Sequence, residues 1–318
     1  MAEVEIVMPC FNCQPWLDRF MESLRAQEGA VWHLIARDDA SIDGTPVSLL
    51  AWKKRLGDRM TLIENIDRNN LGVVENFNTL LGSTRGRWVM TADPDDIWLP
   101  EKIGRSLGVL REAETRFGEA TPLAVFTDLE VIDEQEHVIA RSYWRWAHND
   151  PDRISKITHV AMETPAIGPT MVVNRALLNL ALPIPRATHT QDWWLAMVAA
   201  AFGHLIAIKD QTVRYRRHAS NDSSPPAYTS MGELARNILT APGKLKRRLE
   251  KVLYEQTTPL AGAFVERYRD QLNLHDVSAL EALAGLRSRG PIRRRMDVLR
   301  HGLWFASPLK NVGFILLC

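Results

Sequence analysis

Short apolar runs alternate with helix-like segments over the first 130 residues, and this alternation limits the chain to a small set of folds. Five runs have the length and the residue types of buried strands: residues 4–8, 32–36, 60–63, 88–91 and 123–127. Four segments between these runs carry apolar side chains at helical spacing: residues 16–26, 46–56, 74–81 and 102–117. Strands that alternate with helices predict a mostly parallel sheet covered by helices. We therefore predict an α/β fold with a doubly wound sheet.

The second half of the chain is less regular. Residues 168–173 and 204–208 have the pattern of strands, and residues 190–202 have the pattern of a buried helix. The stretch after His218 is rich in Ser, Asn and Pro, which cannot continue a strand or a helix. We therefore predict a domain boundary there, between residues 1–225 and a helical, basic and apolar extension over residues 226–318.

The fourth predicted strand, residues 88–91, is followed by three carboxylates within four positions: Asp93, Asp95 and Asp96. Carboxylates this close together repel one another unless a cation lies between them. Ligands of open α/β sheets bind at the carboxyl ends of the strands, so this motif predicts a divalent-metal site for a phosphorylated substrate. The alternative is that the acids cap the next helix, but a helix start needs one or two carboxylates at most.

Polar or turn-forming residues also follow the first three predicted strands: Pro9, Phe11, Asn12, Asp38, Asn70 and Gly72. Phe11 offers a ring on which a base can stack, and Asp38 or Asp39 can accept a hydrogen bond from a base or a ribose, with Asp38 favoured. Gly72 permits a positive φ or a close approach of the backbone to a ligand. Turn chemistry explains each of these residues taken alone. Together they predict the wall of a nucleotide pocket.

Asp192 lies beside two tryptophans at the start of the predicted helix over residues 190–202. A carboxylate in that position suits a general base that acts on a hydroxyl, and aromatic faces are good platforms for sugar rings. The alternative is a helix cap with two core tryptophans.

Arg214, Arg216 and His218 alternate along a predicted strand and so share one of its faces. Arginine can neutralise a diphosphate, and a neutral imidazole can join oxygen ligands on a divalent ion. A solvated basic strand is the alternative, and the acidic strand end makes a metal-diphosphate site the preferred interpretation.

The formal net charge of +1 argues against a protein that works by binding nucleic acid. Basic residues cluster late, over residues 244–251 and 287–300, near the apolar residues 303–305 and 314–317. Such basic runs are usually solvated helix faces, and the alternative here is contact with an anionic membrane surface. No run approaches the roughly 20 apolar residues of a membrane span, and the N-terminus lacks a secretion signal. A cytoplasmic protein, at the inner face of the cell membrane if the tail binds lipid, is therefore expected.

Cys10, Cys13 and Cys318 are too few for a disulfide framework, which agrees with a reducing compartment. The spacing of Cys10 and Cys13 also occurs in redox and zinc sites. No second pair of Cys or His ligands follows, so neither role is favoured.

Taken in order, these motifs resemble the family 2 glycosyltransferases with the GT-A fold, and within them the bacterial rhamnosyltransferase-like members. The resemblance covers about residues 1–225 and rests on six motifs. Three of them lie in the first 80 residues: the Pro-x-aromatic-Asn turn at 9–12, the Asp-Asp-Ala-Ser-x-Asp-Gly-Thr stretch at 38–45, and the Asn-x-Gly with Asn-Phe-Asn at 70–78. The other three are the Asp-x-Asp at 93–95, Asp192 on its predicted helix, and the Arg-Arg-His at 216–218. Two departures from the family pattern are Gln191, where many members have Glu, and Phe11, where Tyr is frequent.

The resemblance implies a GT-A-type sheet, mixed but mostly parallel and flanked by helices. It implies an inverting hexosyltransferase that moves a sugar, with rhamnose on dTDP suggested, from a nucleoside diphosphate to a glycan or lipid-linked acceptor in cell-surface polysaccharide synthesis. Asp95 would hold Mg²⁺ or Mn²⁺ on the donor diphosphate, with His218 as a second ligand, and Asp93 would lie near the ribose and the metal. Asp192 would deprotonate the acceptor hydroxyl, and Arg216 with His218 would stabilise the leaving group. Asp96 could share the metal with Asp95.

Two other classes of protein compete with this interpretation. A sugar nucleotidyltransferase also uses an α/β nucleotide sheet and a metal, but it would carry a Gly-rich, Arg-containing loop after the first strand, and residues 9–16 have none. A non-catalytic GT-A-like scaffold of an envelope-assembly complex would not need the acidic residues that this chain retains.

Overall fold

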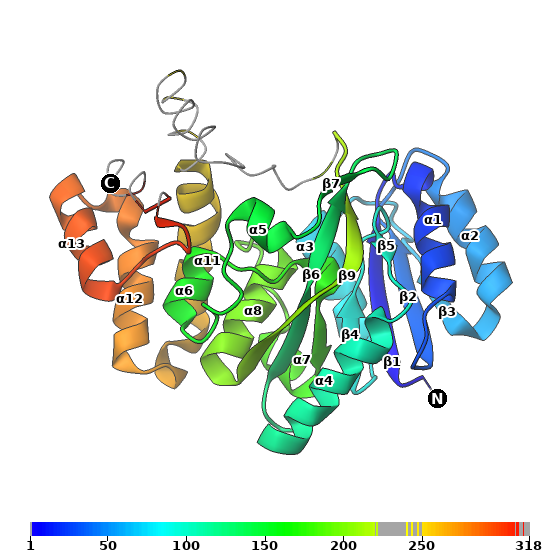
Figure 1. The fold of residues 1–318 in the computed structure, drawn as a ribbon, viewed down its shortest axis with the longest axis horizontal. Coiled ribbons are helices and arrows are strands. Elements are labelled where there is room, and N and C mark those ends of the chain that lie inside the picture. Colours follow the sequence, from blue (N-terminus) through cyan, green and yellow to red (C-terminus); the bar gives the residue numbers. More distant parts are fainter. Residues whose placement is uncertain are drawn as a thin grey trace. The chain divides into compact units, whose positions relative to one another are not determined.

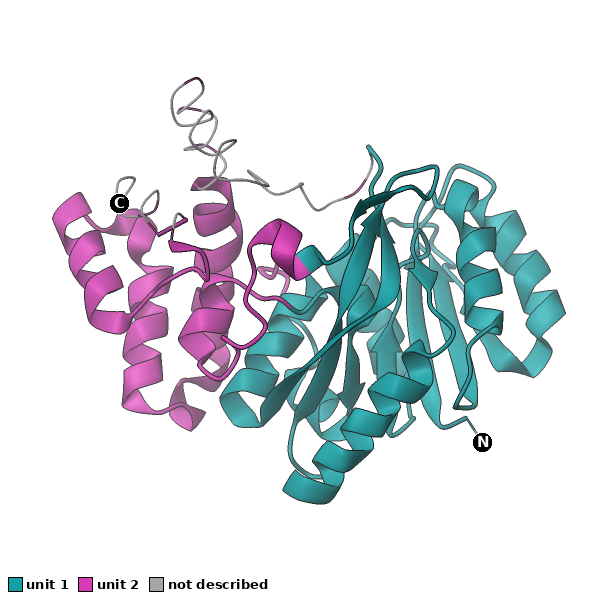
Figure 2. Cartoon of the chain, viewed as in Figure 1, with its two compact units in different colours: residues 1–143, 166–184, 190–220 teal, residues 144–165, 185–189, 221–318 magenta. Residues whose placement is uncertain are grey.

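The computed structural model (Figure 1) describes residues 2–219, 221, 240, 243, 247, 250–308, 310, 311 and 314 of the 318-residue chain. The chain divides into two compact units, coloured separately in Figure 2. Unit 1 comprises residues 1–143, 166–184 and 190–220, and unit 2 comprises residues 144–165, 185–189 and 221–318. The predicted boundary between residues 225 and 226 lies outside the described residues.

Within its described residues, unit 1 holds a nine-stranded sheet in the order β3-β2-β1-β4-β8-β6-β9-β5, with β7 beside β6 (Figure 1). The pairs β1–β2, β2–β3, β1–β4 and β6–β9 are parallel, and the pairs that involve β5, β7 or β8 are antiparallel. The strands are β1 (Val4–Cys10), β2 (Trp32–Asp38), β3 (Met60–Ile63), β4 (Trp88–Thr91), β5 (Ile97–Trp98), β6 (Leu123–Ile132), β7 (Val138–Ala140), β8 (Val172–Asn174) and β9 (His204–Arg216). The predicted mixed, mostly parallel sheet is confirmed.

Helices flank this sheet and are in chain order α1 (Gln14–Arg25), α2 (Thr45–Leu56), α3 (Val73–Ser83), α4 (Lys102–Phe117), α7 (Arg175–Ala181) and α8 (Gln191–Phe202). Helix α3 packs on β1 and β2, whereas α4 packs on β6 and β8. Every residue of β4 is buried, as is nearly all of β6. The short apolar runs predicted these strands correctly because a strand covered on both faces is apolar along its whole length.

The segment at residues 168–173 differs from its prediction as a strand. Residues Gly168–Thr170 form a 3₁₀ turn, and only Val172–Asn174 pair in the sheet. Pro169 has no amide hydrogen to donate to a strand ladder, which explains why the strand starts after it. The two predicted strand segments, residues 204–208 and the segment with Arg214 and Arg216, belong to one strand, β9, which ends at Arg216.

Unit 2 is helical in the residues that the structure describes. Its elements are α5 (Tyr143–Ala147), α6 (Ile157–Met162), the π-helical turn η3 (Val252–Thr257), α11 (Thr258–Tyr268), α12 (Leu274–Ala284) and α13 (Pro291–His301). The first residue of α5, Tyr143, is counted in unit 1. Helix α12 packs against α6, α11 and α13. The helices predicted for the C-terminal extension are therefore confirmed from residue 250 onwards.

The apolar tail differs from its prediction as an exposed patch. Leu303, Phe305 and Phe314 are buried, and Phe305 and Phe314 make an edge-to-face ring contact at 5.5 Å between centroids. Residues 244–246, 248 and 315–318 lie outside the described residues. Among the residues that the structure describes, no helix is both long enough and apolar enough to span a bilayer.

Candidate active site

The carboxyl ends of six strands lie at one edge of the sheet. Strands β1, β2, β3 and β4 run parallel, and β6 and β9 run in the same direction because β8 is antiparallel to both β4 and β6. Most of the predicted site residues lie in the last residues of these strands or in the turns after them, whereas Asp192 lies in the first turn of α8. The fold thus brings together side chains that are about 200 residues apart in the sequence. This edge is where ligands bind in open α/β sheets.

Hydrogen bonds join the turns after β1 and β2. The Asn12 amide donates to Ser41 Oγ at 2.8 Å, and Asn12 Oδ1 accepts from the Ile42 amide at 2.9 Å. Asp38 Oδ2 accepts from the Ser41 amide at 3.1 Å, whereas Asp38 Oδ1 is buried without a hydrogen-bond partner in the described chain. Phe11 is 53% exposed. The turns thus present one free carboxylate oxygen and one free ring.

Asp39 has a different function from its neighbour Asp38. Its buried carboxylate pairs with Arg37 at 2.7 Å and accepts from the amides of Leu71 and Gly72 at 3.0 and 2.9 Å. The Nδ2 of Asn70 donates to the Asp39 carbonyl at 3.1 Å. Gly72 has φ +79°, a left-handed conformation that favours glycine. Asp39 therefore anchors the loop after β3.

The three carboxylates after β4 differ in exposure. Asp96 is fully buried, and its Oδ1 accepts from the Arg216 amide at 3.0 Å. Burial raises the pKa of Asp96 well above its ordinary value, and the charges of Asp95 and Asp93 raise it further. Asp93 and Asp95 are partly exposed, and Asp95 Oδ2 lies 2.9 Å from His218 Nε2. Asp95 is therefore placed to reach a ligand, whereas Asp96 is enclosed.

The donor atoms of Asp95 and His218 suit a hard divalent ion. Asp95 Oδ2 and His218 Nε2 share a hydrogen bond at 2.9 Å. Two ligand atoms in adjacent octahedral positions around Mg²⁺, each about 2.1 Å from the ion, would lie about 3.0 Å apart. Within the described ranges, no group of three or more His, Cys, Asp or Glu side chains is arranged to hold a metal. Mg²⁺ sites with substrate phosphates commonly use only one or two protein ligands, so this pair fits such an ion.

Trp16, in α1, is a site residue that the sequence analysis missed. Its ring stacks on His218 with centroids 5.4 Å apart, and the Arg216 guanidinium lies 4.8 Å from the same ring. Helical apolar spacing assigned Trp16 only to a covering helix. A contact between residues about 200 positions apart leaves no signal in a single sequence. His218 itself lies two residues beyond the end of β9, so it is not part of the predicted strand.

Arg216 differs from its prediction as a group that contacts the donor. Its side chain is 2% exposed, its Nε donates to the Asp95 carbonyl at 3.0 Å, and its Nη2 donates to Glu136 Oε1 at 3.3 Å. Glu136 is also paired with Arg19 at 3.0 Å. The guanidinium is thus enclosed by protein, and it fixes the backbone that carries Asp95.

Asp192 is connected to the strand that carries the acids. Its Oδ2 accepts from the Gly168 amide at 2.8 Å, and its Oδ1 accepts from the Trp193 amide at 2.7 Å. The Gly168 carbonyl in turn accepts from Thr91 Oγ1, at the end of β4, at 2.5 Å. A Cβ on Gly168 would lie 2.8 Å from Gln191 Nε2, so a larger residue here would displace the end of the Gln191 side chain. One short path of hydrogen bonds therefore holds Asp192 near the acidic turn.

Cys10 and Cys13 are free thiols, and both are buried beside the first turn. A hydrogen bond that the Cys10 thiol donates to Cys13, together with burial, raises the pKa of Cys10 well above its ordinary value. A raised pKa makes a thiol less reactive, so the geometry adds no support for a redox role.

Lys102, the first residue of α4, is a buried cation close to the acidic turn. Its Nζ lies 4.5 Å from the Trp98 ring centroid, and it has no hydrogen-bond partner among the residues described. Burial lowers the pKa of Lys102 to about 7, although the negative charge of Asp96 acts in the opposite direction. Lys102 is therefore a titratable group whose protonation the fold disfavours.

The Lys102 pKa predicts how stability depends on pH. Because the folded pKa lies below the unfolded value, the unfolded chain binds more protons between pH 7 and about 10.5. Stability from this group is thus fully present above pH 10.5 and is lost as the pH falls to 7. Between pH 7.5 and 9.5 we expect the free energy of unfolding of the wild type to rise more steeply with pH than that of Lys102→Met. The difference between the two slopes should be about 1 kcal/mol per pH unit. Denaturant unfolding at several pH values measures this difference, with the exposed Lys54→Met as the control. Parallel pH profiles for wild type and Lys102→Met would contradict it.

Comparison with known proteins agrees with this geometry. Residues 5–145 match the family model "Glycosyl transferase family 2". The "Putative glycosyltransferase EpsE" of Bacillus subtilis is 28% identical over 129 residues, which cover 41% of this chain and 46% of that protein. The "UDP-Glc:alpha-D-GlcNAc-diphosphoundecaprenol beta-1,3-glucosyltransferase WfgD" of Escherichia coli is 24% identical over 225 residues, which cover 70% of this chain and 79% of that protein. Several curated relatives, EpsE among them, are matched over less than half of their own length.

Solved structures share the fold. S. aureus TarS 1-349 in complex with UDP aligns with a TM-score of 0.51 at 14% identity, over 95% of this chain and 93% of that one. The mannosyltransferase PcManGT from Pyrobaculum calidifontis, in complex with GDP-Man and Mn²⁺, aligns with a TM-score of 0.50 at 18% identity, over 98% of this chain and 86% of that one. The fold is thus of the GT-A type. Over residues 5–145 the chain matches glycosyltransferase family 2, and the relatives named above are glycosyltransferases.

Proposed function

We propose that the protein is an inverting, metal-dependent hexosyltransferase of cell-surface polysaccharide synthesis. It would move a sugar from a nucleoside diphosphate to a hydroxyl of a glycan or lipid-linked acceptor. The observation that carries this proposal is the hydrogen-bonded path from Thr91 through Gly168 to Asp192, because it holds a basic carboxylate close to the acidic turn. The names of EpsE and WfgD support the class of reaction, and the name of WfgD, a glucosyltransferase that uses UDP-Glc, includes a lipid-linked acceptor.

The donor nucleotide would bind at the turns after β1, β2 and β3. Phe11 is exposed enough to stack on the base, and the free Asp38 Oδ1 can accept a hydrogen bond from the base or the ribose. Pro9, near the end of β1, and Asn12, in the turn after it, would line the pocket at the first strand end. Asn70 and Gly72 would line it after β3, where Asp39 anchors them.

The diphosphate would lie against Asp93, Asp95 and His218. Bound Mg²⁺ or Mn²⁺ would neutralise the negative charge that develops on the departing nucleoside diphosphate. Asp95 and His218 would be its protein ligands, and Asp93 would lie near the ribose. Arg216 is enclosed by protein, so it would hold the backbone of Asp95 in position and would not contact the donor itself.

Asp192 would accept the proton of the acceptor hydroxyl. The oxygen would then attack the anomeric carbon on the face opposite the leaving nucleoside diphosphate, which inverts the configuration at that carbon. The amides of Gly168 and Trp193 fix the position of the Asp192 carboxylate. Geometry of this kind is what a general base requires.

The identity of the donor sugar is a separate part of the proposal. Rhamnose on dTDP is suggested by the sequence resemblance, whereas the names of WfgD and of the PcManGT complex contain UDP-Glc and GDP-Man. We place the activity in the cytoplasm, at the inner face of the cell membrane if the acceptor is lipid-linked.

A panel of nucleotide sugars tests the proposed function. The protein is incubated with UDP-, GDP- and dTDP-linked sugars in Mn²⁺ or in EDTA, and release of nucleoside diphosphate is measured. Release with one donor that requires Mn²⁺, and a product of inverted anomeric configuration by NMR, is the expected result. Release that persists in EDTA would contradict the metal site. Pyrophosphate release from a nucleoside triphosphate and a sugar phosphate would instead identify a nucleotidyltransferase.

A further inference from the structure

Helix α13 has an apolar stripe on its exposed side. Ile292, Met296 and Leu299 lie at positions i, i+4 and i+7, and their exposed fractions are 77%, 64% and 66%. Val298, on the opposite side, is 1% exposed and packs into unit 2. Successive helical residues are separated by 100°, so the three apolar side chains form one stripe along the helix. An exposed stripe of large apolar side chains is costly in water and marks an interaction surface.

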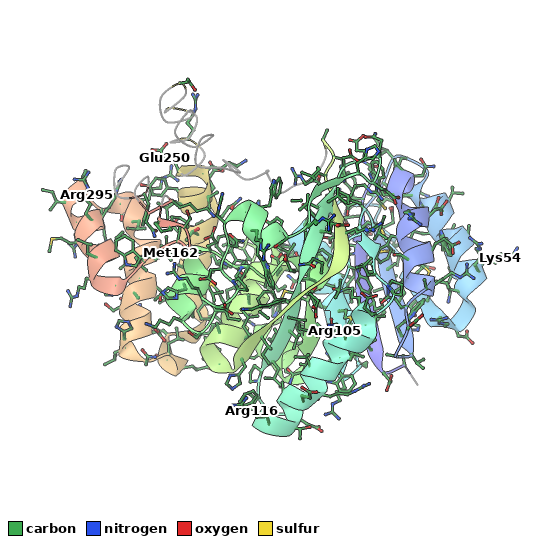
Figure 3. The ribbon with its side chains drawn as sticks, viewed as in Figure 1. Lys54, Arg105, Arg116, Met162, Glu250 and Arg295 are labelled. Atoms are coloured by element: carbon green, nitrogen blue, oxygen red, sulfur yellow. The ribbon has the colours of Figure 1, made fainter. Side chains whose placement is uncertain are left out.

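Arginines flank this stripe on both edges. At 100° per residue, Arg293 and Arg300 lie along one edge and Arg295 along the other, and all three are exposed. Figure 3 shows the Arg295 side chain on the outer side of α13. The single acidic residue of the helix, Asp297, is partly buried and paired with Arg289. The exposed side of α13 therefore combines apolar and cationic groups only.

A helix of this kind has the pattern of helices that lie in the interface of an anionic bilayer. In that position the apolar side chains reach the acyl boundary and the arginines reach the lipid phosphates. A second copy of the chain is a poorer partner, because two α13 faces brought together would oppose the arginines of one copy to those of the other.

We propose that α13 docks on an anionic lipid surface, with Ile292, Met296 and Leu299 inserted and with Arg293, Arg295 and Arg300 on the phosphates. Leu303, Phe305 and Phe314, which the sequence places in the apolar tail, are buried and do not contribute to this surface. The inference is independent of the proposed function, because lipid binding requires neither donor nor metal.

Flotation with lipid vesicles tests this docking surface. The full chain is mixed with phosphatidylcholine vesicles that contain or lack phosphatidylglycerol, at about 50 mM and about 500 mM salt. We expect the protein to float with the anionic vesicles at low salt and to be released at high salt. Replacement of Arg293, Arg295 and Arg300 by Gln should lower the partition coefficient about fivefold for each arginine. The triple variant Ile292→Ser, Met296→Ser, Leu299→Ser should lose at least about tenfold.

A matched control removes three exposed apolar side chains from unit 1: Val31→Ser, Val47→Ser and Leu50→Ser. This variant should float like the wild type. Circular dichroism shows whether each variant is folded, and transfer to a water-soluble acceptor should be unchanged in the α13 variants. Equal binding to neutral vesicles, or flotation that survives in both α13 variants, would overturn the proposal. A stripe variant that only converts a dimer to a monomer in the absence of lipid would assign the surface to self-association instead.

Discussion

Asp192→Asn is expected to abolish sugar transfer and to leave donor binding nearly unchanged. The amide is nearly isosteric with the carboxylate, but it cannot accept the proton of the acceptor hydroxyl. Loss of a general base lowers kcat by about 10²- to 10⁴-fold. The donor contacts that we propose lie on other strand ends, so the dissociation constant for the nucleotide sugar should change little. Steady-state release of nucleoside diphosphate gives kcat, and calorimetry with donor and Mn²⁺ gives the dissociation constant.

The control for Asp192→Asn must separate lost basicity from lost hydrogen bonds. Asp192 accepts two backbone amides, and so does Asp43, which binds the amides of Gln14 and Thr45. Asp43→Asn should therefore lower the melting temperature by a similar amount but leave kcat within about threefold of the wild type. Turnover by Asp192→Asn within tenfold of the wild-type rate would remove Asp192 from the mechanism.

Asp95→Asn is expected to weaken metal binding and transfer together. The substitution removes a negative charge and a strong oxygen donor from the pair that Asp95 forms with His218 at 2.9 Å. Changes in residues behind a metal ligand typically cost 10- to 100-fold in affinity or activity, so loss of the ligand itself should cost at least about 100-fold in kcat/KM. The Mn²⁺ concentration for half-maximal activity should also rise. Activity measured over a Mn²⁺ titration gives both values.

The exposed Asp58→Asn serves as the charge-matched control for this second substitution. It also removes one carboxylate from unit 1, but from a short turn before β3. It should keep the wild-type Mn²⁺ dependence. Wild-type activity abolished by EDTA should return when Mn²⁺ is added in excess. An Mn²⁺ titration of Asp95→Asn that coincides with the wild-type curve would exclude Asp95 as a ligand.

Local patterns predicted the sheet well where each strand is short and covered on both faces. Strand β4 is buried along its four residues and is followed within a few positions by acidic residues. A short stretch of sequence was therefore enough to predict both the buried strand and the acidic turn at its end. Residues 168–170 were predicted as part of a strand because they precede the apolar residues 171–173, but they form a buried 3₁₀ turn. Hydropathy reports burial, and it does not distinguish between two buried backbone conformations.

The long β9 strand was only partly predicted for a related reason. Its second half pairs with β5 on one side and β6 on the other, and it mixes charged and polar residues with apolar ones. Pairing partners distant in the sequence supply its hydrogen bonds, so no local apolar run was needed to keep it extended.

The sequence alone determined the alternation of strands and helices, the acidic turn at the end of β4 and the polar turns beside it. These features depend on side-chain period and on turn chemistry, which act over a few neighbouring residues. Only the tertiary structure decided that Asp95 is accessible while Asp96 is enclosed, and that Arg216 is buried against Trp16. It also decided that α13 presents an exposed apolar stripe. Exposure depends on which distant segments pack over a side chain, and that is a property of the folded chain as a whole.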